Sequence, residues 1–137
     1  MAAGNFSFTI EQGATTDFEL VYKDSNENPV DLTGYVARMQ LKNAAGGDTT
    51  YLTLSSSLQP DGTGLNLSGS GGNPASKPLS SGSIGIYISH ATSSNLTFAN
   101  AVYDLEIVSG SGNSAVVTRL IQGKVNLSKE VTTGDSY

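Results

Sequence analysis

Apolar and polar residues alternate through much of this chain of 137 residues, which is the pattern of β-strands that bury one face. In residues 35–42, for example, Ala37 and Met39 fall on one side, and Arg38 and Gln40 fall on the other. The same period of two predicts strands at residues 6–11, 17–23, 35–42, 50–54, 84–89, 101–108 and 115–127. Turn-forming residues separate these stretches at intervals of about eight to fifteen residues, a spacing typical of β-sandwiches and barrels.

The segments between the strands contain several turn signals and one helical signal. Residues 110–113 are rich in glycine and are predicted to form a hairpin, and Gly123 is expected to bend or bulge the last long strand. Residues 89–96 are the only helical candidate, with Ser89 or Thr92 as the expected capping residue. The chain is therefore predicted to be all-β with short connectors.

Residues 55–82 do not follow the strand pattern. These 28 residues contain eight Ser, six Gly and three of the four Pro residues of the chain, and only residues 65–67 suggest a brief strand. A loop of this length in a compact domain is usually either functional or flexible. We predict a single domain over residues 1–137 in which residues 55–82 form a Ser/Gly/Pro-rich loop insertion, either a surface excursion or a contact loop in an assembly.

Composition excludes several classes of function. The net charge is −5, from seven Lys and Arg residues against twelve Asp and Glu residues, so a nucleic-acid partner is not expected. The absence of cysteine excludes disulfides, thiolate metal sites and cysteine nucleophiles. The sequence contains no apolar run of the roughly 18 residues that a membrane span needs, and no signal peptide is apparent. We therefore expect synthesis in the cytoplasm and no membrane partner.

The candidates for chemistry are weak. His90 is the only histidine, and it lies in a connector rich in Ser and Thr, without a nucleophile-elbow motif elsewhere in the chain. The loop that begins at Asp24 opens like a calcium loop, but Pro29 and Tyr35 stand where such a loop needs Gly and Glu. A polar turn is the main interpretation, and a weak cation site remains open with four candidate ligands, Asp24, Asn26, Asn28 and Asp31. We predict no catalytic, cofactor-binding or metal-binding residues, and no small-molecule substrate.

Two arginines lie in the middle of predicted strands. Arg38 and Arg119 are out of phase with their apolar neighbours, so both point to the polar side of a sheet. Each is expected to pair with an acid such as Asp104 or Glu106 on a neighbouring strand, and a role in a protein interface is the alternative.

Several motifs resemble a family of small β-sandwich proteins of tailed bacteriophages. In the first half they are residues 8–13 (FTIEQG), 29–35 (PVDLTGY) and 37–40 (ARMQ). In the second half they are residues 85–86 (GI), 103–106 (YDLE), 118–123 (TRLIQG) and 130–132 (EVT). The PVDLTGY motif also has a local explanation, because Asp31 can accept hydrogen bonds from nearby backbone donors and Gly34 tolerates a left-handed conformation.

The resemblance implies an immunoglobulin-like antiparallel β-sandwich of about seven to nine strands, and a location in the virion. Members of this family are structural proteins of the neck, collar, baseplate or tail-fibre attachment site. The expected partners are other phage virion proteins and further copies of the same chain in a homo-oligomer. Two other functions remain as hypotheses: a capsid decoration (cement) protein, and a carbohydrate-binding or adhesion module. The lack of Trp argues against the second, since sugar-binding platforms favour flat aromatic faces.

Overall fold

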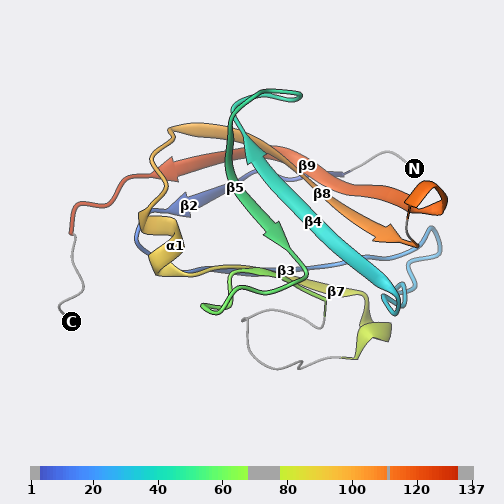
Figure 1. Cartoon of the computed structure of the whole chain (residues 1–137). Coiled ribbons are helices and arrows are strands. Elements are labelled where there is room, and N and C mark those ends of the chain that lie inside the picture. The colour runs from blue at the N-terminus through green and yellow to red at the C-terminus, as the bar shows by residue number, and fades with distance from the viewer. Residues whose placement is uncertain (1–3, 68–77, 111, 133–137) are drawn as a thin grey trace.

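The computed structural model describes residues 4–67, 78–110 and 112–132. Nine strands, one short α-helix and two 3-10 turns follow one another along these residues (Figure 1). The strands are β1 (Gly4–Asn5), β2 (Phe8–Glu11), β3 (Thr16–Val21), β4 (Tyr35–Lys42), β5 (Thr50–Ser55), β6 (Gly64–Asn66), β7 (Ser83–Ile88), β8 (Asn100–Ser109) and β9 (Val116–Ser128). The helix is α1 (His90–Ser94), and the 3-10 turns are η1 (Leu79–Ser81) and η2 (Gly112–Ser114).

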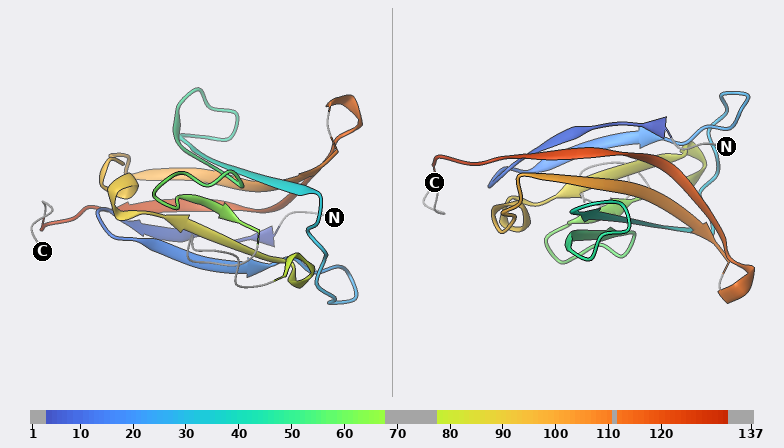
Figure 2. Two further views of the ribbon diagram at one scale, coloured as in Figure 1. Left: turned by 60° about the horizontal axis from the view of Figure 1, so that its bottom comes forward. Right: turned by 90° about the horizontal axis from the view of Figure 1, so that it is seen from above.

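The strands form two sheets that stack as separate layers (Figure 2). The larger sheet has the order β1-β9-β8-β4-β5, with β2 also paired to β9, and the smaller sheet has the order β3-β7-β6. Both β1 and β2 run parallel to β9, and the other strand pairs are antiparallel. This is the strand order of an immunoglobulin domain with an extra strand beside its third strand. The predicted immunoglobulin-like β-sandwich is therefore confirmed.

The core lies between the two sheets and is built by the alternation seen in the sequence. In β4, Ala37, Met39 and Leu41 are buried while Arg38 and Gln40 are exposed. The facing strand β7 buries its isoleucines, and Leu96 and Phe98, which follow α1, are also buried. The largest fully buried side chains are Ile10, Leu32, Met39, Leu41, Leu54, Leu65, Ile84, Ile86, Ile88, Leu105, Ile107 and Val125. The polar positions of the larger sheet are thereby left on its outer face.

The bulge in β9 does not lie at the predicted glycine. The register between β8 and β9 shifts between Leu105 and Glu106, which places the extra residue at Leu120 rather than at Gly123. Gly123 instead lies where the chain passes from β1 to β2, and a Cβ atom there would overlap the backbone carbonyl of Phe6. The glycine is needed because the crossing chain leaves no room for a side chain.

Two predicted features of the connectors, the helical turn and the brief strand, can be compared with the described residues. α1 begins at His90, and the Ser89 hydroxyl accepts a hydrogen bond from the Thr92 backbone N–H at 3.1 Å, so Ser89 is the cap. Within residues 55–82, β6 forms close to the brief strand expected at residues 65–67 and pairs with β7. Residues 68–77 of that segment lie outside the described residues, as does residue 111 of the predicted hairpin at residues 110–113.

Candidate functional site

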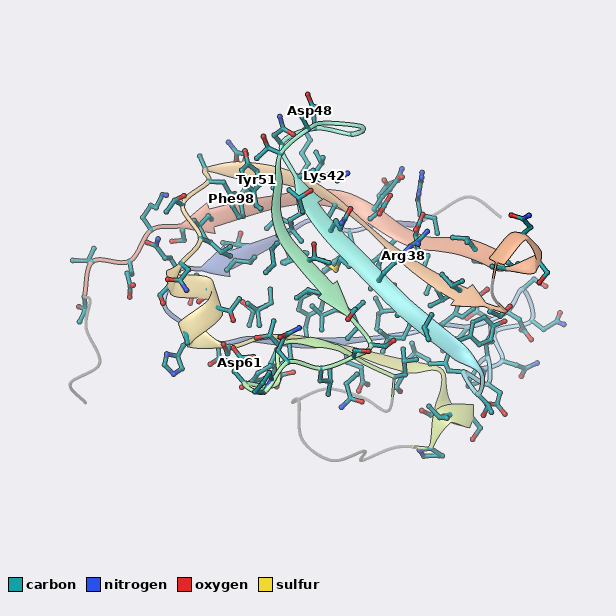
Figure 3. All side chains as sticks on the ribbon, in the orientation of Figure 1. Arg38, Lys42, Asp48, Tyr51, Asp61 and Phe98 are labelled. Atoms are coloured by element: carbon teal, nitrogen blue, oxygen red, sulfur yellow. The ribbon has the colours of Figure 1, made fainter. Side chains whose placement is uncertain are left out.

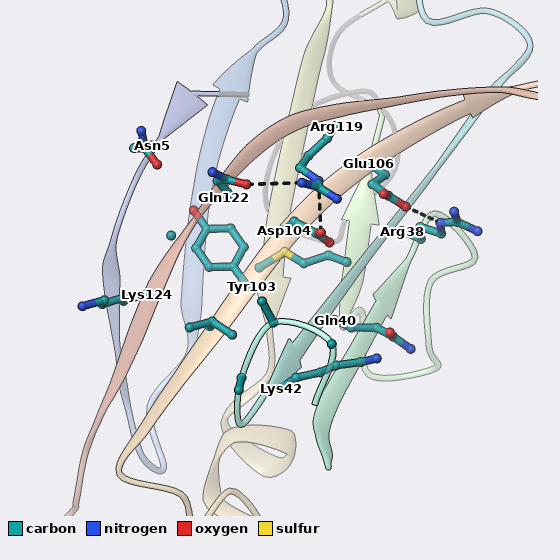
Figure 4. A pocket seen from close by; sticks show the side chains of 16 residues that line it. Asn5, Arg38, Gln40, Lys42, Tyr103, Asp104, Glu106, Arg119, Gln122 and Lys124 are labelled. Carbon is teal, nitrogen blue, oxygen red and sulfur yellow. Dashed lines mark hydrogen bonds and ion pairs between the residues drawn. The ribbon is translucent and has the colours of Figure 1, made fainter. Parts of the chain in front are cut away.

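An open groove of about 660 Å³ crosses the outer face of the larger sheet. Side chains of β4, β8 and β9 form its floor, and the turn between β4 and β5 forms one wall (Figure 4). The charged residues that line it are Arg38, Lys42, Asp104, Glu106, Arg119 and Lys124. The groove therefore combines these charged side chains with apolar lining atoms, and it lies on the face opposite to the core.

The register of the sheet explains why these side chains gather. Arg38 pairs with Glu106 and Glu106 with Arg119, so the three residues form one row across β4, β8 and β9. Lys42, Val102 and Lys124 form another such row further along the same strands. Directly paired residues of neighbouring strands project to the same face, so both rows point into the groove.

Both arginines make ion pairs across strands, as the sequence predicted. Arg38 Nε lies 2.7 Å from Glu106 Oε1, and Arg119 Nε lies 3.2 Å from Asp104 Oδ2. Arg119 Nη1 also donates to Gln122 Oε1 at 3.5 Å. The arginine side chains remain 58% and 52% exposed, so each pair contributes about 0–1 kcal/mol to stability and leaves guanidinium surface open to a partner.

The second row is arranged differently. Lys42 and Lys124 flank Val102 on the two neighbouring strands, so their backbones lie about 10 Å apart, or two strand spacings. Within the described residues, neither lysine ammonium group makes a hydrogen bond or an ion pair. Asp104, the acid in the adjacent row, is already paired with Arg119. This end of the groove therefore presents two unneutralised positive charges.

The groove differs in charge from the rest of the molecule. It contains four of the seven basic residues and two of the twelve acidic residues, a local charge of +2. The remaining three basic and ten acidic residues give the rest of the chain a charge of −7. An anionic group would thus be attracted to this face and repelled by most of the remaining surface.

An aromatic cluster supports the groove from below. The Tyr103 hydroxyl donates a hydrogen bond of 2.5 Å to the Phe6 carbonyl, and its ring meets that of Phe8 edge-on at 5.1 Å. Burial raises the pKa of Tyr103 to about 12, so this phenol stays protonated in neutral solution. Tyr103 thus has a structural role: it fixes the crossing between β1 and β2 against β8.

A second polar cluster lies at the end of the sandwich beside α1, and its centre is Asp61 (Figure 3). Asp61 Oδ2 accepts hydrogen bonds from Ser89 Oγ at 2.5 Å and from Thr92 Oγ1 at 2.8 Å, and Oδ1 accepts from the Thr63 N–H at 3.0 Å. Thr63 Oγ1 in turn accepts from the Ser89 N–H at 3.0 Å. The hydrogen bond from Ser89, with those from Thr63 and Thr92, holds the pKa of Asp61 well below its ordinary value.

This Asp61 cluster has a structural role. It ties the connector between β5 and β6 to the cap of α1, and its polar atoms are satisfied by one another. Among the described residues, the Asp61 carboxylate is the only base that the Ser89 hydroxyl is seen to contact, and its lowered pKa makes it a weak one; Ser89 Oγ is in addition occupied as the cap of α1. Neither sequence periodicity nor spacing pointed to Asp61.

The candidates considered from the sequence do not converge. His90 is exposed at the first position of α1. The Asp24 carboxylate accepts from the N–H groups of Asn26 and Asn28 at 2.9 and 3.0 Å, which makes the loop a polar turn. The Asp31 carboxylate accepts from the Thr33 hydroxyl and N–H, which lowers its pKa, and Gly34 has a φ of 83°. Among the described residues, no three His, Asp or Glu side chains are placed to hold a metal ion.

Comparison with known proteins assigns this chain to no family. No protein-family model matches the chain, and no curated protein matches it. Among solved structures, a chicken TCR has a TM-score of 0.48 and 12% sequence identity, and the match covers 96% of this chain. The chain matches 56% of the length of that receptor chain. No helix within the described residues is both long and apolar enough to span a membrane.

Proposed function

We propose that this chain is a non-enzymatic structural protein of a tailed-bacteriophage virion. It acts as a multi-copy β-sandwich adaptor at the neck, collar or baseplate, where it connects or anchors tail fibres. The motif resemblance at residues 29–40 and 103–123 supports the phage assignment, and the immunoglobulin-like strand order is the fold which that resemblance implies.

The observation that carries the proposal is the open basic groove on an otherwise acidic molecule. A typical enzyme active site is a concave pocket in which a nucleophile, an acid or a base surrounds the reacting atom. The groove instead offers two paired arginines and two lysines that have no partner among the described residues. This arrangement suits the docking of another surface.

The partner that fits this face is an acidic segment of another virion protein. Arg38 and Arg119 can each bind a carboxylate in a planar, bidentate manner, and Lys42 and Lys124 can each neutralise a further charge. Contacts between exposed charges are individually weak, so a single copy would bind poorly. In a virion with several copies, the effective concentration at neighbouring sites strengthens the same contacts.

The experiment compares two charge reversals in phage particles. One variant carries Lys42→Glu and Lys124→Glu in the groove. The matched control carries Lys23→Glu and Lys129→Glu, which cause the same change in net charge on exposed positions outside it. A phage that lacks its own copy is complemented with each protein, and the purified particles are quantified by mass spectrometry.

We expect the wild-type chain and the control in several copies per particle, and the groove variant reduced at least about tenfold because its docking charge is inverted. Absence of the wild-type chain from particles would overturn the proposal. Equal incorporation of the two variants would leave a virion protein that does not dock through the groove. Strong binding of the isolated protein to a glycan array would favour the carbohydrate-binding hypothesis instead.

A further inference from the structure

Among the described residues, the edge strands of the two sheets are not equally protected against pairing with another strand. The edge strands β1, β2 and β6 have only two, four and three residues. The edge strand β3 has six residues but carries Asp17 and Glu19. The edge strand β5 also has six residues, Thr50–Ser55, with no charge, no Pro and no Gly among them. Short length and charge are the usual means of blocking an edge, and β5 has neither.

The β5 strand is firmly held on its inner side, so its edge is preformed. Leu54 is buried in the core, and Tyr51 stacks on the ring of Phe98 with a centroid distance of 4.7 Å. The sequence Thr-Tyr-Leu-Thr-Leu-Ser combines β-branched, aromatic and aliphatic residues, which favour strands. The strand therefore keeps its extended shape without a partner on the open side.

The open part of this edge is centred on Thr53. The Ser56 N–H donates to the Ala37 carbonyl of β4, and backbone groups alternate in direction along a strand. The N–H and C=O of Thr53, three residues earlier, therefore point away from β4. The open stretch ends on one side at Tyr51, where the register with β4 shifts. It ends on the other side at Ser55, because Gly64 packs close to the Ser55 carbonyl.

We infer that β5 pairs in antiparallel fashion with β5 of a second copy, about a two-fold axis at Thr53. The two Thr53 residues then exchange two backbone hydrogen bonds, and Leu52 of each copy lies opposite Leu54 of the other on the core side. A two-fold contact brings identical residues together, so an uncharged strand pairs with itself without repulsion. The equivalent pairing of two β3 strands would place carboxylates of both copies close together.

This pairing joins the two larger sheets into one continuous sheet and leaves both grooves on the same face. The inference rests on the proposed function, because a contact of a few residues on each strand is small and gains strength in a multi-copy assembly. The partner at the β5 edge is thus a second copy of this chain, in addition to the acidic partner at the groove.

The test uses the full chain and two substitutions at one position. Thr53→Pro removes the outward N–H while sparing the hydrogen bonds between β4 and β5, and Thr53→Lys adds a charge to the edge. The control is Thr9→Lys, the same charge change at an exposed position on the opposite edge of the same sheet. Sedimentation at concentrations up to about 1 mM, a range that detects weak association, is combined with amide hydrogen exchange.

We expect reversible dimers for the wild type and for Thr9→Lys, and monomers for both Thr53 variants. The Thr53 amide of the wild type should exchange more slowly as concentration rises. A wild type that stays monomeric, or Thr53 variants that dimerise equally well, would overturn the inference. If Thr53→Pro melts at a much lower temperature, Thr53→Lys alone decides the result.

The outcome is separable from that of the proposed function. A monomeric wild type that is nevertheless found in several copies per particle contradicts the edge pairing and leaves the virion role intact. A chain that dimerises through β5 but is absent from particles contradicts the virion role and leaves the edge pairing intact.

Discussion

The Asp61 cluster lies on connectors of the sandwich, and the basic groove lies on its strands. The two differ in how far their charged groups are paired within the chain. The Asp61 carboxylate accepts three hydrogen bonds from Ser89, Thr92 and Thr63. In the groove, Lys42 and Lys124 have no partner within the described residues.

This difference suggests a stabilising role for the Asp61 cluster and a binding role for the groove. A polar group that accepts several hydrogen bonds within the chain adds to stability and has less capacity left for a partner. An exposed charge without a partner adds nothing to stability and is available for binding. Changes at Asp61 should therefore alter folding, and changes at the lysines should alter binding.

The largest effect is expected from removal of the Asp61 carboxylate. Asp61→Ala breaks three hydrogen bonds and leaves the Ser89 and Thr92 hydroxyls without their acceptor, so we expect a loss of about 2 kcal/mol in the free energy of unfolding. Urea denaturation measures this loss. Asp48→Ala, an exposed acid in the turn between β4 and β5, is the control and should change stability by less than about 0.5 kcal/mol. Equal effects of the two substitutions would contradict the stabilising role of the Asp61 cluster.

The groove is expected to show the opposite behaviour. Lys42→Glu with Lys124→Glu should leave the free energy of unfolding within about 0.5 kcal/mol of the wild type. The same variant should bind a fluorescent polyglutamate peptide at least about tenfold more weakly, as measured by anisotropy in low salt. The Lys23→Glu and Lys129→Glu control should retain most of the affinity. If both variants lose affinity alike, net charge and not the groove determines binding.

Acid should weaken the Asp61 cluster. The pKa of Asp61 is lower in the folded chain than its ordinary value of 3.8, so its contribution is complete above that value and is lost as the pH falls below it. Thermal melts of the wild type and Asp61→Asn between pH 7 and pH 2 measure this. The two melting temperatures should converge as the pH drops below about 4. A constant difference over the whole range would contradict the account.

The smallest effect is expected at the paired arginines. Arg38→Ala removes an exposed ion pair with Glu106 and should cost less than about 1 kcal/mol of stability. A double-mutant cycle with Glu106→Gln measures the coupling, which should shrink further in high salt. A coupling above about 2 kcal/mol would show that this pair, like the Asp61 cluster, mainly stabilises the fold.

The fold was largely predictable because the alternation of Ala37, Met39 and Leu41 with Arg38 and Gln40 directly reflects one buried and one exposed face. The pairing of Arg38 and Arg119 with acids of β8 followed from the same reasoning and is confirmed. A strand glycine often marks a bend or a bulge, which is the reason for the prediction at Gly123, but the sequence holds no sign of which other segment crosses nearby.

The two polar clusters were harder to foresee. Asp61 stands in a segment that resembles a featureless loop, and its partner Ser89 is 28 residues away. Lys42 and Lys124 become neighbours of Val102 only through the register of three strands. Charged outward positions of predicted strands were the one available signal, and strand order is needed to turn that signal into a groove.

The central claim is the proposed virion role, and a cryo-EM map of particles of the phage proposed to carry this chain tests it most directly. The account predicts several copies at the neck, collar or baseplate, each with the Lys42 and Lys124 end of its groove against an acidic segment of a neighbouring protein. Density for the chain only on the capsid shell, or no density for it in the particle, would contradict the account.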